Sequence, residues 1–186
     1  MDHLEHVKSR IPDYAKDIRL NLDGALTRSS LTPQHAAGAA LAAAFAARAP
    51  VLVDALRASP ALSAEHGDAA LTAAALMGMN NVWYPYVEMA DDAELKTLRP
   101  ELRMNAYASH GGVDRISFEL YALAASTLGK CHFCVASHYQ LLKESGLTVQ
   151  QLRDVGRIAA VVNAAAQVLA AAAPSSAAEA AIAAAA

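Results

Sequence analysis

Four residues in the second half of the chain have the types and spacing needed for thiol redox chemistry. Cys131 and Cys134 are the only cysteines in the sequence, and His138 follows four residues after the second of them. If this stretch is helical, the three side chains fall at i, i+3 and i+7 on one face. Cysteines three apart on the first turn of a helix lie within the Cα separation that a disulfide tolerates. The helix N-terminus also favours thiolate over thiol, so Cys134 and His138 could form a reactive pair.

Glu119 is the fourth member of this group and lies on the helix expected to precede the cysteines. A break at Gly129 would fold that helix back and bring Glu119 towards His138. A carboxylate there would orient the imidazole, as in other arrangements of nucleophile, base and orienting acid. A thiolate at the end of this relay could attack the weak O–O bond of a peroxide and become a sulfenic acid. The second cysteine would then condense with that acid to give a disulfide.

A zinc site is the main alternative use of the same residues. Its ligands would be Cys131, Cys134 and His138, with either His132 or Glu119 as the fourth. Structural zinc more often uses two separated ligand pairs, and the sequence has no second CxxC and no HxxxH. These grounds favour redox chemistry over metal binding, and a non-catalytic zinc-binding or assembly module remains the alternative function.

The elements that must position these residues are predicted to be helices. Residues able to cap a helix N-terminus stand at four places: Thr32, Ser63, Asp114 and Thr148. Gly78 and Pro85 are expected to break the helix that Ser63 starts, and residues 91–109 are expected to be helical with a stop at Pro100. Gly129 is expected to take the left-handed conformation that ends a helix. The cluster "MGMNNVWY" (77–84) could line a ligand pocket, but a group of Met and aromatic residues on a helix is more typical of a core.

Composition and patterning indicate one all-α domain. The chain has 186 residues, enough to bury a core without disulfides or metals, and no segment alternates in the manner of a strand. We therefore predict a single-domain helical bundle over residues 1–173 that contains a CxxC helical hairpin. Residues 174–186 are a low-complexity, alanine-rich tail that we expect to be frayed or disordered. A weak internal two-fold repeat is also conceivable, with residues 68–84 matching 119–135.

Charge and hydropathy argue against two classes of partner. The formal net charge is −3, which offers no electrostatic reason to expect nucleic acid. The apolar run at 158–173 falls short of the about 20 residues that span a bilayer, so no membrane segment is expected. The charged N-terminus has no apolar signal region, so a cytoplasmic location is expected. In a reducing cytosol, an isolated CxxC is more often catalytic, redox-sensing or metal-binding than structural.

The constellation Glu119–x11–Cys131–x2–Cys134–x3–His138 in an alanine-rich, helical chain resembles the alkyl hydroperoxide reductase D family. The stretches "PDYAKDIRLNL", "MGMNNVWY" and "LRPELRMNAYA" are also similar to that family, so the resemblance runs from the N-terminus to about residue 173. The family lies within the carboxymuconolactone decarboxylase-like superfamily. A cofactor-free reaction known in helical relatives would leave the CxxC without a role.

The resemblance implies a function and an assembly. It implies an antioxidant enzyme, an oxidoreductase of the lipoyl-dependent peroxidase type, whose all-α subunits form a homotrimer. Its substrates would be organic hydroperoxides, and it would re-reduce a partner peroxiredoxin, the C subunit of the same system. Electrons would come from a dihydrolipoyl group on a 2-oxoacid dehydrogenase component, ultimately from NADH, with no cofactor bound to the chain.

The resemblance also implies roles for the four residues. Cys134 would be the peroxidatic thiol, Cys131 the resolving thiol, His138 the proton shuttle and Glu119 its partner. Spacing alone leaves the order of the thiols open, because thioredoxin-type motifs usually use the first cysteine. One position departs from the family pattern: the residue directly before the second cysteine is Phe133 instead of a histidine.

Overall fold

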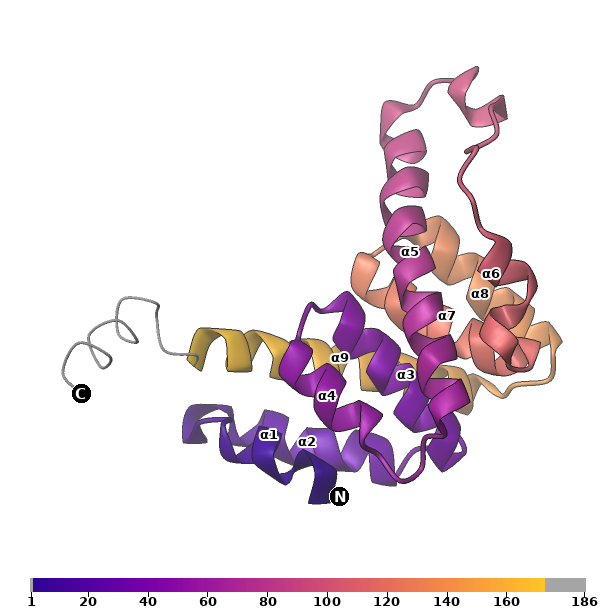
Figure 1. The fold of residues 1–186 in the computed structure, drawn as a ribbon. Coiled ribbons are helices and arrows are strands. Elements are labelled where there is room, and N and C mark those ends of the chain that lie inside the picture. Colours follow the sequence, from indigo (N-terminus) through magenta and orange to yellow (C-terminus); the bar gives the residue numbers. More distant parts are fainter. Residues whose placement is uncertain (1, 173–186) are drawn as a thin grey trace, which may run out of the picture.

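The computed structural model describes residues 2–172 and is helical over most of that range, with no strand within it (Figure 1). The α-helices are α1 (Glu5–Ser9), α2 (Lys16–Thr27), α3 (Pro33–Ala46), α4 (Pro50–Arg57), α5 (Ala64–Ala90), α6 (Asn105–Ala108), α7 (Arg115–Gly129), α8 (His132–Glu144) and α9 (Val149–Ala172). Short 3-10 helices are η1 (Asp2–Leu4), η2 (Asp13–Ala15), η3 (Leu95–Thr97) and η4 (His110–Gly112). The predicted all-α fold is confirmed. The predicted tail, residues 174–186, lies outside the described residues.

Polar side chains begin four of the helices, as the sequence predicts. Thr32, Ser63 and Asp114 each accept a hydrogen bond from the backbone N–H three residues further on. Thr148 and Gln151 bond reciprocally, since each side chain accepts the other residue's backbone N–H. Such caps satisfy N–H groups that have no partner inside the helix. They therefore determine where α3, α5, α7 and α9 begin.

Helix α3 is the centre of the bundle and packs against α5, α7 and α9. Its residues from Ala36 to Ala44 are buried on all sides, which small side chains permit. Gly38 allows the closest approach, because a Cβ there would overlap the buried ring of Tyr121 on α7. Close packing of α3 thus holds α7 in place, and α7 carries Glu119.

Gly38→Ala should lower the free energy of unfolding by about 1–3 kcal/mol, because the added methyl group overlaps a rigid, buried ring. Gly156→Ala on α9 is the matched control, since no atom from outside its own helix lies within 4 Å of the position of its Cβ. That change should instead raise stability by about 0.5–1 kcal/mol. Denaturant unfolding of both variants measures the difference, and equal stabilities would contradict the close approach of α3 to α7.

Helix α5 runs without interruption through Gly78 and Pro85, so the predicted break is wrong. Tertiary packing is the reason at Gly78: Met77 and Asn80, on either side of the glycine, are both buried in the bundle. Pro85 lies further along, where α5 projects from the other helices (Figure 1). Residues 68–84 therefore do not share the helix–break–helix geometry of 119–135, and an internal repeat remains only a possibility.

Residues 91–109 are largely non-helical, which corrects the prediction of a helix stopping at Pro100. Only η3 and the short α6 form there, and most residues from 91 to 103 are exposed. Asp91 ends α5 in the left-handed conformation, with φ of 48°. Without neighbours to bury an apolar face, a helix here has little to stabilise it. Residues 82–104, here called the arm, project from the bundle and lead back to it at α6 (Figure 1).

The α7–α8 hairpin forms where the sequence predicts it, with one change of residue. Lys130, not Gly129, takes the left-handed conformation, with φ of 53°. Gly129 is the last residue of α7, and a Cβ there would overlap the side chain of Asn81 on α5. The glycine is therefore required by the close approach of α5 and not by its own backbone angles.

Helix α9 is long and apolar enough, by length and composition only, to cross a membrane. In this fold its buried residues pack against α2, α3 and α7 instead. Its buried Asp154 accepts hydrogen bonds from the backbone and side chain of Ser30, and it pairs with Arg153 and Arg157. Buried charged residues of this kind have partners, and Asp154 is hydrogen-bonded to the loop before α3. We therefore assign α9 the role of a core helix.

Candidate active site

Cys131 and Cys134 form a disulfide at the first turn of α8. Their Cα atoms are 5.3 Å apart, and the two residues are only 1% and 3% exposed. Cys131 is the N-cap residue of α8, and its sulfur accepts the backbone N–H of Cys134 at 3.2 Å. A negative charge on that sulfur would be stabilised by the N–H group and by the positive end of the helix. The helix start therefore suits Cys131 to leave as a thiolate when the disulfide is reduced.

His138 is joined to Glu119 across the α7–α8 hairpin. Its Nδ1 lies 2.6 Å from Oε2 of Glu119, and the two residues are 6% and 0% exposed. The second carboxylate oxygen of Glu119 accepts a hydrogen bond of 2.5 Å from the hydroxyl of Tyr107 on α6. Glu119 thus lies against His138, as the predicted hairpin requires, and Tyr107 joins them from a helix that the sequence did not assign to the site.

The Glu119 carboxyl is held in its ionised form despite its burial. Burial by itself would raise its pKa, but hydrogen bonds from His138 and Tyr107, with the electrostatic influence of His138 and Arg115, outweigh that effect. The pKa is therefore lowered from the ordinary value of 4.5. For Tyr107, burial followed by the hydrogen bond to Glu119 raises the pKa, which keeps the phenol protonated as a donor. An ionised carboxylate only accepts, so Nδ1 of His138 must carry the proton in this bond.

Met77 on α5 is the neighbour of the other ring nitrogen of His138. The distance from its Sδ to Nε2 is 3.2 Å, and Met77 is fully buried. With Nδ1 donating to Glu119, Nε2 is the nitrogen that can take or release a proton. Sequence reasoning placed Met77 in the core and did not single out Tyr107. Both residues lie in stretches that resemble the family, and this resemblance was the only indication in the sequence that they could belong to the site.

A pocket of about 430 Å³, here called the thiol pocket, is lined by Cys134 and His138. Its other walls include Asn80 and Tyr84 of α5, Tyr107 of α6 and Phe133, Ser137 of α8. Cys131 is not among its lining residues, and its sulfur lies 3.9 Å from the backbone oxygen of Asn80. Cys134 is therefore the sulfur presented to a molecule in this pocket.

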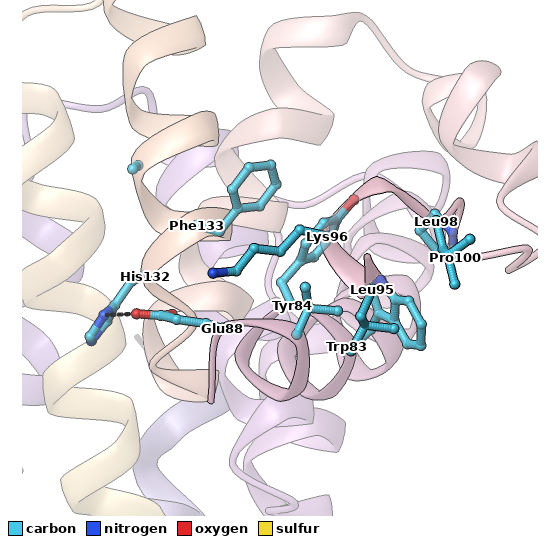
Figure 2. Close-up of a pocket in the computed structure, with 11 residues that line it drawn as sticks. Trp83, Tyr84, Glu88, Leu95, Lys96, Leu98, Pro100, His132 and Phe133 are labelled. Atoms are coloured by element: carbon cyan, nitrogen blue, oxygen red, sulfur yellow. Dashed lines mark ion pairs between the residues drawn. The ribbon is translucent and has the colours of Figure 1, made fainter. Parts of the chain in front are cut away.

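A second pocket of about 670 Å³, here called the arm pocket, lies between the arm and α8 (Figure 2). Its lining residues are mostly apolar or aromatic: Trp83, Tyr84, Val87, Leu95, Leu98, Pro100, Phe133 and Ala136, with Glu88, Lys96 and His132 as the polar members. Tyr84 and Phe133 line both pockets. The prediction that "MGMNNVWY" is simply core is thus wrong for Trp83 and Tyr84, because the arm pocket leaves their rings beside open space.

Comparison with known proteins identifies the family. The model of the carboxymuconolactone decarboxylase family matches residues 93–185. The chain is 46% identical to "Alkyl hydroperoxide reductase AhpD" of Rhodospirillum centenum, an alignment that covers 89% of this chain and 90% of the relative. Proteins of the same name from Bradyrhizobium sp. (strain BTAi1) and Streptomyces coelicolor are 44% and 42% identical, covering 88% and 87% of this chain and 91% of each relative. The chain belongs to the AhpD family.

Membership of the AhpD family confirms the resemblance seen in the sequence. The zinc alternative can be compared with the positions of its suggested ligands. Among residues 2–172, no group of three or more His, Cys, Asp or Glu side chains is placed to hold a metal ion. His132, one of the suggested ligands, is exposed and faces Glu88, with its Nδ1 3.5 Å from a carboxylate oxygen. The described fold therefore brings together Cys131, Cys134, His138 and Glu119, but leaves His132 outside the group.

Glu119→Gln tests the charge of this AhpD-family site, since glutamine keeps the shape and much of the hydrogen bonding. Because the pKa of Glu119 is lowered in the folded protein, its stabilising effect is complete above 4.5 and is lost as the pH falls through the folded value. At pH 7 the variant should be less stable than wild type by about 1–3 kcal/mol, and the gap should close as the pH falls below 4.5 and through the lowered pKa of Glu119. Denaturant unfolding across this range measures it, and a gap independent of pH would contradict the ionised state of Glu119.

Proposed function

We propose that this AhpD-family protein is an antioxidant enzyme that reduces organic hydroperoxides through a dithiol–disulfide cycle of Cys131 and Cys134. The observation that carries the proposal is the Cys131–Cys134 disulfide whose pocket-facing sulfur shares the thiol pocket with His138. The printed name of the relatives, alkyl hydroperoxide reductase, supports the same reaction. In this cycle the dithiol supplies two electrons, and the peroxide is reduced to an alcohol and water.

The first half of the cycle assigns Cys134 as the peroxidatic thiol and His138 as its proton shuttle. His138 takes the Cys134 proton at Nε2, while Glu119 holds the Nδ1–H and balances the charge of the imidazolium. The thiolate attacks one oxygen of the hydroperoxide, so that an S–O bond forms and the O–O bond breaks. The leaving alkoxide takes the proton from His138 and departs as the alcohol. Cys134 is left as a sulfenic acid.

The second half assigns Cys131 as the resolving thiol. Its sulfur attacks that of Cys134, the S–S bond forms, and the sulfenic oxygen leaves as water with the proton of Cys131. The Cα separation of 5.3 Å allows this bond without movement of the backbone. The product is the disulfide found at the start of α8.

An external dithiol closes the cycle, and we assign this role to a dihydrolipoyl group on a 2-oxoacid dehydrogenase component, with electrons ultimately from NADH and no bound cofactor. The donor thiolate would attack Cys134, the sulfur that faces the thiol pocket, and Cys131 would leave as a thiolate at the α8 N-terminus. The reduced pair could then pass electrons to a partner peroxiredoxin, the C subunit of the same system, by the same thiol–disulfide exchange.

The proposal includes assembly as a homotrimer in the cytoplasm. Contact between copies is supported by an exposed apolar stripe on the projecting half of α5, formed by Val82, Tyr86 and Met89. These residues recur at i, i+4 and i+7, so they share one face of the helix. Contact between copies of the chain would remove such a stripe from water.

Single cysteine variants test the assignment of the two thiols. Cys134→Ser should abolish peroxide reduction with dihydrolipoamide as the donor, because the attacking sulfur is lost. Cys131→Ser should accumulate a sulfenic acid on Cys134 after brief exposure to peroxide, because no second thiol can condense with it. Mass spectrometry after dimedone labelling locates the adduct. Full activity of Cys134→Ser would overturn the assignment. So would a sulfenic acid that forms on Cys131 in Cys134→Ser while none forms on Cys134 in Cys131→Ser.

A reconstituted system tests the electron path. Reduced lipoyl component, its NADH-dependent reductase and this protein should together oxidise NADH when an organic hydroperoxide is added. Addition of the partner peroxiredoxin should increase the rate, because a second peroxidase then draws on the same electrons. The double variant Cys131→Ser/Cys134→Ser is the control. Peroxide-dependent NADH oxidation that is as fast with the double variant as with wild type would refute the path.

A further inference from the structure

We propose that the arm pocket binds the apolar tail of the hydroperoxide while its O–O group reaches Cys134 in the thiol pocket. This inference rests on the proposed function and specifies its substrate class: hydroperoxides that carry an aromatic ring or a long alkyl chain. The tail would lie between the arm and α8, where Figure 2 shows Trp83, Tyr84, Leu95, Leu98 and Phe133 around the pocket.

The two pockets meet at one pair of aromatic rings. Tyr84 of α5 and Phe133 of α8 line both, and their rings are stacked with centroids 4.3 Å apart and planes 24° apart. Phe133 directly precedes Cys134 on α8, and the residue is 55% exposed. A ligand that reaches past this ring pair would therefore have one end in the arm pocket and the other beside the Cys134 sulfur.

The chemistry of the arm pocket suits an apolar group. Its volume of about 670 Å³ lies within the range of small-molecule sites, which are mostly apolar with a few polar groups. The charged groups at its edge are already paired: Glu88 with His132, and Lys96 with Asp91. A hydrocarbon tail gains by leaving water against the apolar walls, and it leaves these exposed groups in place.

Phe133 lies directly before Cys134 and lines both pockets. The ring of Phe133 stacks on the ring of Tyr84, and it gives each of the two pockets an apolar wall. We therefore assign Phe133 to substrate selection in this chain: it is a wall for the tail.

Ala136→Phe tests the inference by filling the arm pocket. Ala136 is exposed on α8 and lines the arm pocket but not the thiol pocket. Stopped-flow measurements on the reduced protein would give rate constants for cumene hydroperoxide, which has a bulky ring, and for hydrogen peroxide, which has no tail. The ratio of the first to the second should fall about tenfold in the variant.

Two further variants make the result specific. Leu98→Ala removes an apolar contact from the arm instead of filling the pocket, and it should also lower the ratio several-fold. Ala160→Phe places the same substitution at an exposed position on α9 that lines none of the described pockets, and it should leave the ratio unchanged.

The remaining outcomes overturn the inference in distinguishable ways. An unchanged ratio in Ala136→Phe and Leu98→Ala, with wild type active on both peroxides, would remove the tail site and leave the proposed function standing. If Ala136→Phe instead slows only the reduction of the disulfide by dihydrolipoamide, the arm pocket receives the reductant and not the peroxide tail. Wild-type protein that is oxidised by neither peroxide would refute the proposed function itself.

Discussion

The buried hydrogen bond between Glu119 and His138 is the interaction on which the rest of the site depends. A carboxylate with no exposed surface is costly unless hydrogen bonds replace its water. Here the His138 Nδ1–H and the Tyr107 hydroxyl supply them at 2.6 Å and 2.5 Å. These two bonds need three helices in register: α7 carries the acid, α8 the imidazole and α6 the phenol. The tight turn at Lys130 is what brings α7 and α8 into that arrangement.

Helix α5 is the second constraint, because one straight element serves both the core and the site. Met77 is buried beside His138, and the backbone oxygen of Asn80 lies near Cys131. Further along the same helix, Trp83 and Tyr84 form walls of the arm pocket. A break at Gly78 would separate these two functions. The continuity of α5 through Gly78 thus connects the surroundings of His138 to the pocket that we propose for the substrate tail.

Prediction from the sequence succeeded where the relevant physics is local, and it failed where packing decides. Caps such as Thr32 and Asp114 depend only on a side chain and a backbone N–H three residues away. The residue types in the sequence are therefore enough to predict them. Gly78 and residues 91–109 were misassigned because the stability of a helix depends on what its faces contact. Gly129 was identified as important for the wrong reason: the side chain of Asn81, distant in sequence, requires it.

The sequence by itself determined the spacing of Cys131, Cys134 and His138, because a helix converts intervals of three and four residues into one face. It also indicated a hairpin that could return Glu119 to them. Only the tertiary structure decided that Tyr107 and Met77 contact the Glu119–His138 pair, that Cys134 and not Cys131 faces a pocket, and that Phe133 lines two pockets. Those contacts join residues up to 61 positions apart. They arise from the packing of α5, α6 and α8, which no local interval in the sequence encodes.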